Sequence, residues 1–343
     1  MNGSTTERSV WKRSKPRSEM DPKVISLDST KKKSKKNMKS ESRNKPSKRC
    51  CLVAFEELPE YMKDNEYILN YYRADWPLKD AFFSLFRWHN ETLNVWTPFP
   101  SSAEANVSHN SNDFFSGATN FNLKKQSAAL GMTVTSPETS ATRWPFFVFL
   151  CGSMFCLLSS STCHLFACHS HNLNILLLRM DYVGIAVMII TSFFPPIFYI
   201  FQCEPLWQIV YLTGISVMGA FTIVTLLTPA FSTGKFRAFR AMLFVAMGLF
   251  GLVPAVHAVV VNWNESRRNA TLAYESVMAL AYLTGTAFYV TRIPERWKPG
   301  FFDLAGHSHQ IFHVFVILGA LAHYGAALVF LEFRGEVGCG RTK

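Results

Sequence analysis

Six long apolar stretches constrain the fold of this chain more than any other feature of its sequence. Each holds about 20–25 residues, the length that an α-helix needs to cross a hydrocarbon core of ~30 Å. A segment in lipid must satisfy its own backbone hydrogen bonds, which favours helices over open strands. We therefore predict an all-α polytopic membrane protein with helices over residues 145–168, 181–202, 206–229, 239–262, 271–291 and 307–331.

Prolines inside two of these stretches predict interruptions of the helices. Pro195 and Pro196 lie in the second stretch, and Pro254 lies in the fourth. A proline in a helix interior removes one backbone hydrogen bond and clashes with the preceding turn, so we expect kinks at both places.

The first 53 residues form a basic tail. Its first fifty residues hold sixteen Lys and Arg against five Asp and Glu, which accounts for the chain's whole net charge of +11. Such a polar, charged segment is expected to be disordered. Two interpretations stay open: an anchor to anionic lipid headgroups, or a solvated tail that only sets orientation. Nucleic-acid binding is disfavoured because no aromatic platform or recognition helix accompanies the charge.

Between the tail and the apolar stretches, the sequence divides into two polar parts. Residues 54–97 predict a juxtamembrane amphipathic module, in which Tyr61 to Arg73 reads as a short acidic helix. Apolar residues from Leu78 to Trp88 recur at helical spacing, as in a helix that lies in the membrane interface. The remaining divisions are a polar loop at 98–143, a helix bundle at 144–333 and a short C-terminal tail at 334–343.

Basic residues between the apolar stretches predict an orientation. The joints at 169–180, 230–238 and 292–306 share one side of the membrane, because two helices separate each from the next. Seven Lys and Arg lie in or beside these joints, whereas two lie in the opposite joints, 203–205 and 263–270. Cytosolic loops are enriched in Lys and Arg, so we expect the first set in the cytosol.

Polar side chains in the stretches converge on that same side. His309 and His313 are four residues apart, so one helix face carries both. His164 and Ser160 share a face near the end of the first stretch, and Asp181 opens the second. Taken alone, the histidine pair is equally consistent with side chains bonded to water or lipid headgroups at a membrane surface.

Considered together, these residues predict a metal site. A histidine within a membrane span is costly and is a functional candidate by default. Three imidazoles, from His164, His309 and His313, with an open fourth position for water form a zinc ligand set found in enzymes. Asp181 could hold and deprotonate that water, since zinc lowers its pKa to near 7, and Ser160 lies beside it.

The eight cysteines form no CxxC pair and no regular framework. Most lie in apolar segments, where a buried thiol is the common state. We expect no disulfide scaffold.

Seven short motifs recur along residues 54–97 and 145–333 and form a specific set. They are Leu58-Pro59-Glu60-Tyr61, Asp64-Asn65-Glu66-Tyr67-Ile68-Leu69, Trp88-His89-Asn90-Glu91-Thr92-Leu93-Asn94-Val95-Trp96-Thr97, Ser160-x-x-x-His164-x-x-x-Cys168-His169-Ser170, Asp181-Tyr182-x-Gly184-Ile185, Arg292-Ile293-Pro294-Glu295-Arg296 and Ser308-His309-Gln310-Ile311-Phe312-His313-Val314. With them the chain resembles the progestin and adipoQ receptor family, also called the adiponectin-receptor or haemolysin-III-like family, and in particular its plant heptahelical transmembrane proteins.

The resemblance implies a zinc ion bound by His164, His309 and His313 on the cytosolic side, with Asp181 near its water and Ser160 beside it. It also implies a cytosolic N-terminus and a C-terminus outside. Family members are described as hormone receptors, and some resemble alkaline ceramidases, which hydrolyse lipid amides at zinc.

The chain departs from the family after residue 97. In the family the Asn-x-Trp-Thr motif runs directly into a first transmembrane helix, whereas here Pro98 and the polar loop follow Thr97. The first family helix is therefore missing, and six clear transmembrane helices remain. Six helices place both chain ends on one side, so a cytosolic tail would turn the basic joints outward. We hypothesise a spliced or wrongly assembled product that lacks its first span and whose other helices keep the family packing.

The sequence thus predicts a zinc-containing, multi-pass membrane receptor-like protein in hormone, stress or lipid signalling. The alternative is an intramembrane zinc-dependent lipid-amide hydrolase, similar to a ceramidase. Expected partners are anionic headgroups at the tail, a lipid substrate and an unknown extracellular ligand, with no nucleic acid. The expected location is the plasma membrane or an endomembrane, with the tail in the cytosol.

Overall fold

The computed structural model describes residues 51–98, 142–231 and 234–336, all within one compact unit of the chain, residues 48–343. In these residues the structure is helical, and the only extended pairing is an isolated bridge between Val53 and Tyr72. The predicted basic tail, the polar loop and the C-terminal tail lie mostly outside the described residues.

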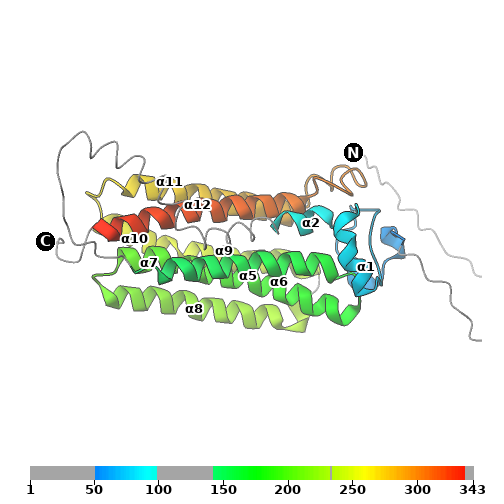
Figure 1. The fold of residues 1–343 in the computed structure, drawn as a ribbon, viewed down its shortest axis with the longest axis horizontal. Coiled ribbons are helices and arrows are strands. Elements are labelled where there is room, and N and C mark those ends of the chain that lie inside the picture. The colour runs from blue at the N-terminus through cyan, green and yellow to red at the C-terminus, as the bar shows by residue number, and fades with distance from the viewer. Residues whose placement is uncertain (1–50, 99–141, 232–233, 337–343) are drawn as a thin grey trace, which may run out of the picture. The chain divides into compact units, whose positions relative to one another are not determined.

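The apolar stretches form the helices of a bundle (Figure 1). α5, α6 and α8 lie side by side, and α11 packs along α12. The helices are α5 (Trp144–Phe166), α6 (His171–Ser192), α7 (Phe194–Ile200), α8 (Pro205–Leu227), α9 (Arg237–Phe250), α10 (Leu252–Val261), α11 (Arg268–Thr291) and α12 (Ser308–Glu336). This arrangement confirms the predicted all-α polytopic class.

Five helical segments of the described chain are long and apolar enough to cross a membrane, when α6 is counted with α7 and α9 with α10. The fifth predicted span, residues 271–291, forms α11. The first half of α11 carries Arg268, Asn269 and Glu275, and this helix does not meet the same measure.

Both predicted proline kinks are confirmed. α6 ends at Ser192, and α7 begins one residue before Pro195. α9 ends at Phe250, and α10 begins two residues before Pro254. The predicted start of the second span was wrong, because α6 begins at His171 rather than at residue 181. Asp181 therefore lies within a helix, since the apolar residues that precede it extend the helical pattern.

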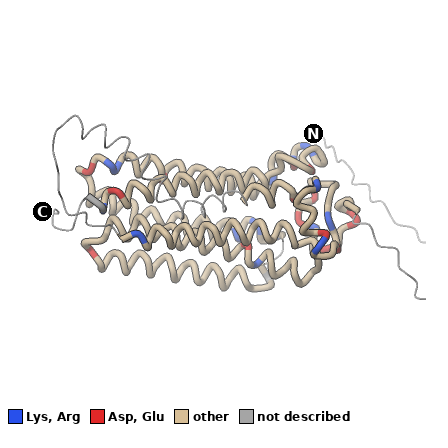
Figure 2. The backbone as a smooth tube through the Cα atoms, viewed as in Figure 1, with Lys and Arg blue, Asp and Glu red and all other residues tan. Residues whose placement is uncertain are grey.

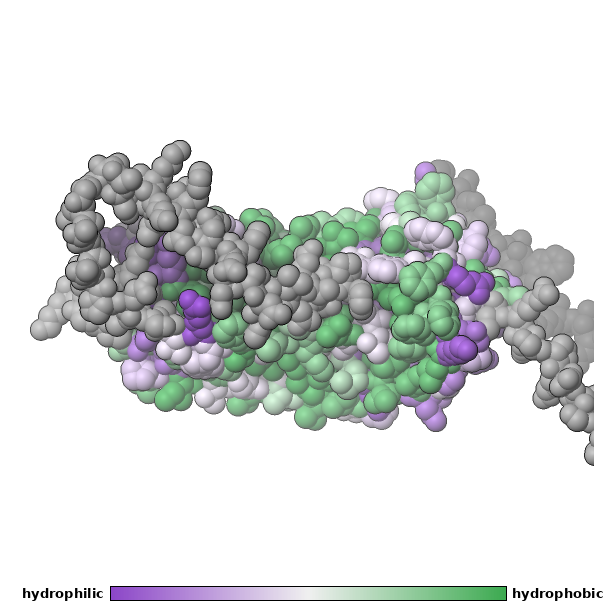
Figure 3. Space-filling model, in the orientation of Figure 1, coloured by the Kyte–Doolittle hydropathy of each residue, from purple (hydrophilic) through white to green (hydrophobic). Residues whose placement is uncertain are grey.

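The surface of the bundle suits a lipid environment. Lys, Arg, Asp and Glu gather toward the two ends of the helices, and few lie between them (Figure 2). Hydrophobic side chains cover the middle of the visible face (Figure 3). On α8, for example, Val217, Phe221 and Val224 are exposed. Apolar surface on this scale would be unfavourable in water and is expected against hydrocarbon.

Close approach of α5 and α6 depends on two glycines. A Cβ added at Gly184 would lie 3.0 Å from the Cα of Cys156, and one at Gly152 would lie 2.0 Å from Oγ1 of Thr191. Small residues let membrane helices approach until their backbones nearly touch. The contact at Gly184 brings the segment around Asp181 against the C-terminal half of α5.

The module at 51–98 is built from short helices: η1 (Phe55–Glu57), η2 (Glu60–Met62), α1 (Leu78–Phe83), η3 (Ser84–Phe86) and α2 (Thr92–Trp96). The predicted acidic helix from Tyr61 to Arg73 was wrong. The N–H of Tyr72 donates to the carbonyl of Val53, and that of Leu69 donates to Asp303, so these donors bind distant residues instead of the preceding turn. The apolar stripe forms α1 and η3, where Phe82 and Phe86 are exposed, and continues to the exposed Trp88 just after η3.

α2 packs against α5 and α12, and the Oγ of Ser161 donates to the carbonyl of Val95, 3.2 Å away. We call this end of the bundle the α2 end. At the opposite end, Thr142 accepts a hydrogen bond of 2.8 Å from the hydroxyl of Tyr199. The described chain therefore stops at residue 98 after packing near the α2 end and resumes at residue 142 near the opposite end of α5.

Among the described residues, Cys156, Cys163 and Cys168 are buried free thiols, whereas Cys51 and Cys151 are exposed free thiols. Cys203, between α7 and α8, is disulfide-bonded.

Candidate metal centre

The last turn of α5 is held by a buried arginine from the module. Arg73 is 2% exposed, and its guanidinium donates to the carbonyls of His164 and Leu165 at 2.7 and 3.0 Å. The last carbonyls of a helix have no partner within the helix, so these bonds satisfy groups that would otherwise be unpaired. They also fix the backbone that carries the His164 side chain.

The first turn of α12 is held by a buried glutamate from the preceding loop. Glu295 is fully buried; it accepts the N–H of Ser308 at 2.7 Å and is also bonded to the Ser308 hydroxyl. Asn65 of the module donates to the same carboxylate at 3.1 Å. A carboxylate at a helix N-terminus satisfies free N–H groups and complements the helix dipole. This anchoring sets the position of His309, the next residue, and of His313 about one turn further along.

These two anchored helices bring three histidines together. The Nε2 atoms of His164 and His309 are 3.1 Å apart, and ligand nitrogens from His164, His309 and His313 all lie within 4.8 Å of one another. The Oγ of Ser160 lies 3.4 Å from Nε2 of His313, and Ser160 is hydrogen-bonded to Asp181. The structure thus places all five predicted site residues in one cluster.

The donor set fits a tetrahedral metal ion. With Zn–N bonds of 2.0–2.1 Å, two nitrogens on tetrahedral zinc lie about 3.3 Å apart. The separation of 3.1 Å between Nε2 of His164 and Nε2 of His309 is close to that value. Three imidazole nitrogens and a free fourth direction are a ligand set that zinc accepts.

A carboxylate that sequence reasoning missed orients one of the imidazoles. Oε2 of Glu91 lies 2.8 Å from Nδ1 of His164 and accepts a second hydrogen bond, of 2.6 Å, from Asn94. A carboxylate at Nδ1 keeps that nitrogen protonated and leaves Nε2 free to bind metal. Glu91 belongs to the quoted Trp88–Thr97 motif, but no local spacing indicates its pairing with a residue 73 positions away.

The electrostatics around Glu91 favour its ionised form. Burial raises the pKa of Glu91, but attraction to His164 and the hydrogen bonds from His164 and Asn94 outweigh burial, so its pKa lies well below the usual value. Burial, with the nearby positive charge of Arg73, lowers the pKa of the adjacent His89 to about 3. His89 is therefore neutral, and its Nδ1 accepts the N–H of Glu91 at 3.1 Å.

A cavity of ≈ 410 Å³ opens from the histidine cluster into the bundle. Asp181, Ser160, His309 and His313 line one part of it, and most other lining side chains are apolar. Tyr182 and Arg240, which were not predicted as site residues, also line it, with the guanidinium 4.8 Å from the tyrosine ring centre. The site is thus joined to a space suited to an apolar ligand.

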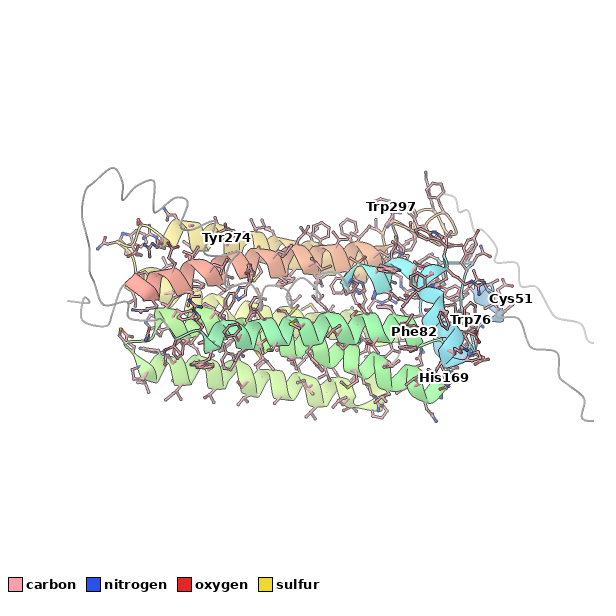
Figure 4. All side chains as sticks on the ribbon, viewed as in Figure 1. Cys51, Trp76, Phe82, His169, Tyr274 and Trp297 are labelled. Atoms are coloured by element: carbon pink, nitrogen blue, oxygen red, sulfur yellow. The ribbon has the colours of Figure 1, made fainter. Side chains whose placement is uncertain are left out.

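Four other histidines of the described chain lie outside the cluster and have partners of their own. Nδ1 of His169 lies 2.8 Å from the carbonyl of Trp76, and Figure 4 shows both residues at the α2 end. Nε2 of His307 lies 3.3 Å from the carbonyl of Asn90. His257 pairs with Tyr211, and His323 pairs with Glu275.

Comparison with known proteins agrees with this architecture. The profile of the family described as haemolysin-III related matches residues 86–324. Heptahelical transmembrane protein 1 of Arabidopsis thaliana is 62% identical over 295 residues, which cover 86% of this chain and 86% of that protein.

Two further relatives extend the match. Heptahelical transmembrane protein ADIPOR1 of Oryza sativa subsp. japonica is 53% identical over 328 residues, covering 85% of this chain and 87% of its own. The adiponectin receptor protein of Drosophila melanogaster is 33% identical over 272 residues, covering 79% and 57%. The chain therefore belongs to the haemolysin-III-related family, the progestin and adipoQ receptor proteins, and is of the plant heptahelical type.

Proposed function

We propose that this protein is a zinc-containing membrane receptor of the adiponectin receptor family that acts in hormone, stress or lipid signalling. The observation that carries the proposal is the cluster of His164, His309 and His313, whose ligand nitrogens lie within 4.8 Å of one another. Histidines are costly inside membrane helices, and three that meet at one point indicate a shared ligand.

His164, His309 and His313 would hold the metal, and their neighbours orient them. Zinc, when bound, supplies a Lewis acid that polarises a carbonyl and lowers the pKa of water at the site. Glu91 keeps Nδ1 of His164 protonated, which leaves Nε2 free to bind a metal. Arg73 and Glu295 fix the helix ends that carry the ligands.

A second candidate function, a lipid-amide hydrolase, is favoured by the cavity. Asp181 and Ser160 line it beside His309 and His313, and its other walls are mostly apolar. A lipid chain can occupy the apolar part while its amide carbonyl lies at the histidines. Asp181, held by Ser160, can take a proton from water there and return it to the leaving amine nitrogen.

We further propose that the α2 end faces the cytosol. The basic joints meet there, because Arg237 forms an ion pair with Asp64 at 2.6 Å and Arg292 forms one with Glu66. Cytosolic loops are rich in such residues. Disulfide-bonded Cys203 lies at the opposite end, where an oxidising compartment would be expected.

With this orientation, the opposite end faces the cell exterior or an organelle lumen, where a receptor ligand would arrive. The proposed location is the plasma membrane or an endomembrane. The basic tail, on the cytosolic side, would bind anionic lipid headgroups, and the cavity would take a lipid substrate or effector.

The substitution His309→Ala tests the proposal. We expect the purified variant to lose stoichiometric zinc, whereas His171→Ala, which changes an exposed histidine of α6, should keep it. A His309→Ala variant with a full complement of zinc would refute the metal site. Fatty-acid release and signalling measured in the same variant separate the two functions: signalling that persists without hydrolysis shows that the receptor does not act through the enzyme.

A further inference from the structure

A histidine–carboxylate pair lies in the cavity away from the histidine cluster. Nδ1 of His323 on α12 is 3.0 Å from Oε1 of Glu275 on α11; the His323 side chain is 3% exposed and the Glu275 side chain 28%. Both residues line the cavity. Neither belongs to the proposed metal centre or to any anchoring contact described above.

The pair is incompletely satisfied by the protein. The 3.0 Å approach of the two side chains is poorly aligned, and by strict geometry neither ring nitrogen of His323 nor Oε1 of Glu275 has a well-directed hydrogen bond among the described residues, although the Ser192 backbone also lies beside His323. Leaving such a buried group unpaired costs about 1–3 kcal/mol, more when it is charged. Buried polar atoms without partners therefore indicate a bound water, ion or ligand group.

The spacing along α12 relates this pair to the metal centre. His323 follows His313 by ten residues and His309 by fourteen, so it lies roughly 15–21 Å further along the helix, on nearly the same face as His309. Figure 4 shows Tyr274, which precedes Glu275, well away from Trp297 at the α2 end. The cavity thus has one polar centre at the histidines, another at this pair far along its length, and charged residues (Glu265, Arg267 and Arg268) at the end beyond it.

We propose that Glu275 and His323 form a binding site for a hydroxyl group carried far along the hydrocarbon chain of a lipid. The inference rests on the proposed function only in placing the carbonyl end of that lipid at the histidine cluster. It states that the protein binds chains hydroxylated near their far end more tightly than unsubstituted chains of equal length.

The chemistry of the pair favours a hydroxyl over an amine. A hydroxyl donates one hydrogen bond and accepts another, so it can donate to the Glu275 carboxylate and accept an N–H of His323. An ammonium group can only donate and would meet the N–H of the imidazole with like polarity. Bringing a charge into this apolar cavity would also cost more than bringing a neutral hydroxyl.

Binding of two matched probes tests the proposal. Palmitic acid and ω-hydroxypalmitic acid are titrated by calorimetry into the purified, zinc-loaded full chain. We expect the hydroxylated acid to bind about tenfold more tightly, the effect of one hydrogen bond to a charged group. In the double variant Glu275→Met, His323→Phe we expect the preference to vanish while palmitic acid still binds, because apolar replacement of both partners leaves no unpaired charge.

Glu332→Gln removes an exposed carboxylate of α12 that does not line the cavity and should keep the preference. Equal binding of the two acids by the wild type, or an unchanged preference in the double variant, would overturn the proposal. If the double variant fails to fold, the single variant Glu275→Gln provides the comparison, and it must lower the ratio. Zinc content and hydrolysis are measured in separate assays. Their loss would count against the proposed function, whereas the ratio of the two fatty-acid affinities would still test this inference.

Discussion

Removing the charge of Glu91 should weaken zinc binding although Glu91 does not face the metal. Its Oε2 accepts a hydrogen bond from His164 at 2.8 Å, which fixes the imidazole with Nδ1 protonated and Nε2 free. In the variant Glu91→Gln the amide can still accept a bond, but it lacks the negative charge and can present its NH₂ group instead. In Glu91→Ala the partner is absent and the ring can rotate.

The size of the effect follows from the role of such partners. Loss of the group that orients a metal-bound histidine typically lowers metal affinity by about 10–100-fold. We expect Glu91→Gln near the lower figure and Glu91→Ala near the upper, which corresponds to about 1.4–2.8 kcal/mol. Asn94 also donates to Oε2 of Glu91, so the alanine variant leaves that amide unpaired as well.

Competition for zinc between the purified protein and a chromogenic chelator measures this affinity. Glu60→Gln is the matched control, because Glu60 lies in the same module with its side chain 88% exposed. The control should bind zinc like the wild type. If both Glu91 variants also bind zinc with wild-type affinity, Glu91 does not orient His164 and the proposed metal geometry is wrong.

Three further predictions concern stability. Arg73→Met should destabilise the protein by about 1–3 kcal/mol for each helix carbonyl left unpaired and should also weaken zinc binding through His164, as thermal unfolding and zinc titration would show. His89 has a pKa of about 3 in the folded protein, below its usual 6.5, so the unfolded chain binds a proton first as the pH falls. The contribution of His89 to the free energy of unfolding is therefore complete above pH 6.5 and falls by about 1.4 kcal/mol per pH unit between 6.5 and 3. The melting temperature should therefore depend less on pH in the His89→Gln variant than in the wild type. Chelation should lower the melting temperature, and excess zinc at about a hundredfold its Kd should restore about 2.7 kcal/mol; a melting temperature indifferent to zinc would contradict the metal site.

The sequence alone was sufficient for the class of fold and for the three histidines, His164, His309 and His313, that the structure brings together. Apolar stretches of span length and prolines within them act through local physics, namely burial in lipid and the backbone of the next turn. The helices and their interruptions therefore follow the predicted stretches, except where α6 begins at His171. The spacing of His309 and His313 is likewise local, because one helix turn separates them.

The failures have a common cause. The backbone of Tyr61–Arg73 does not form a helix because its hydrogen-bond donors bind residues far away, as Leu69 does with Asp303. No periodicity within thirteen residues reveals partners more than two hundred positions away. Local propensity is a weak prior where tertiary bonds compete.

Only the tertiary structure decided how the site is held and what surrounds it. Glu91 meets His164 because α2 packs against the end of α5, and Glu275 meets His323 because α11 lies along α12. In each case the sequence shows both residues, but it does not predict that they pair, because separations of 73 and 48 positions follow no helical repeat. A local sequence pattern indicates which face of a helix is polar. The packing of the whole bundle decides which residue of another helix contacts that face.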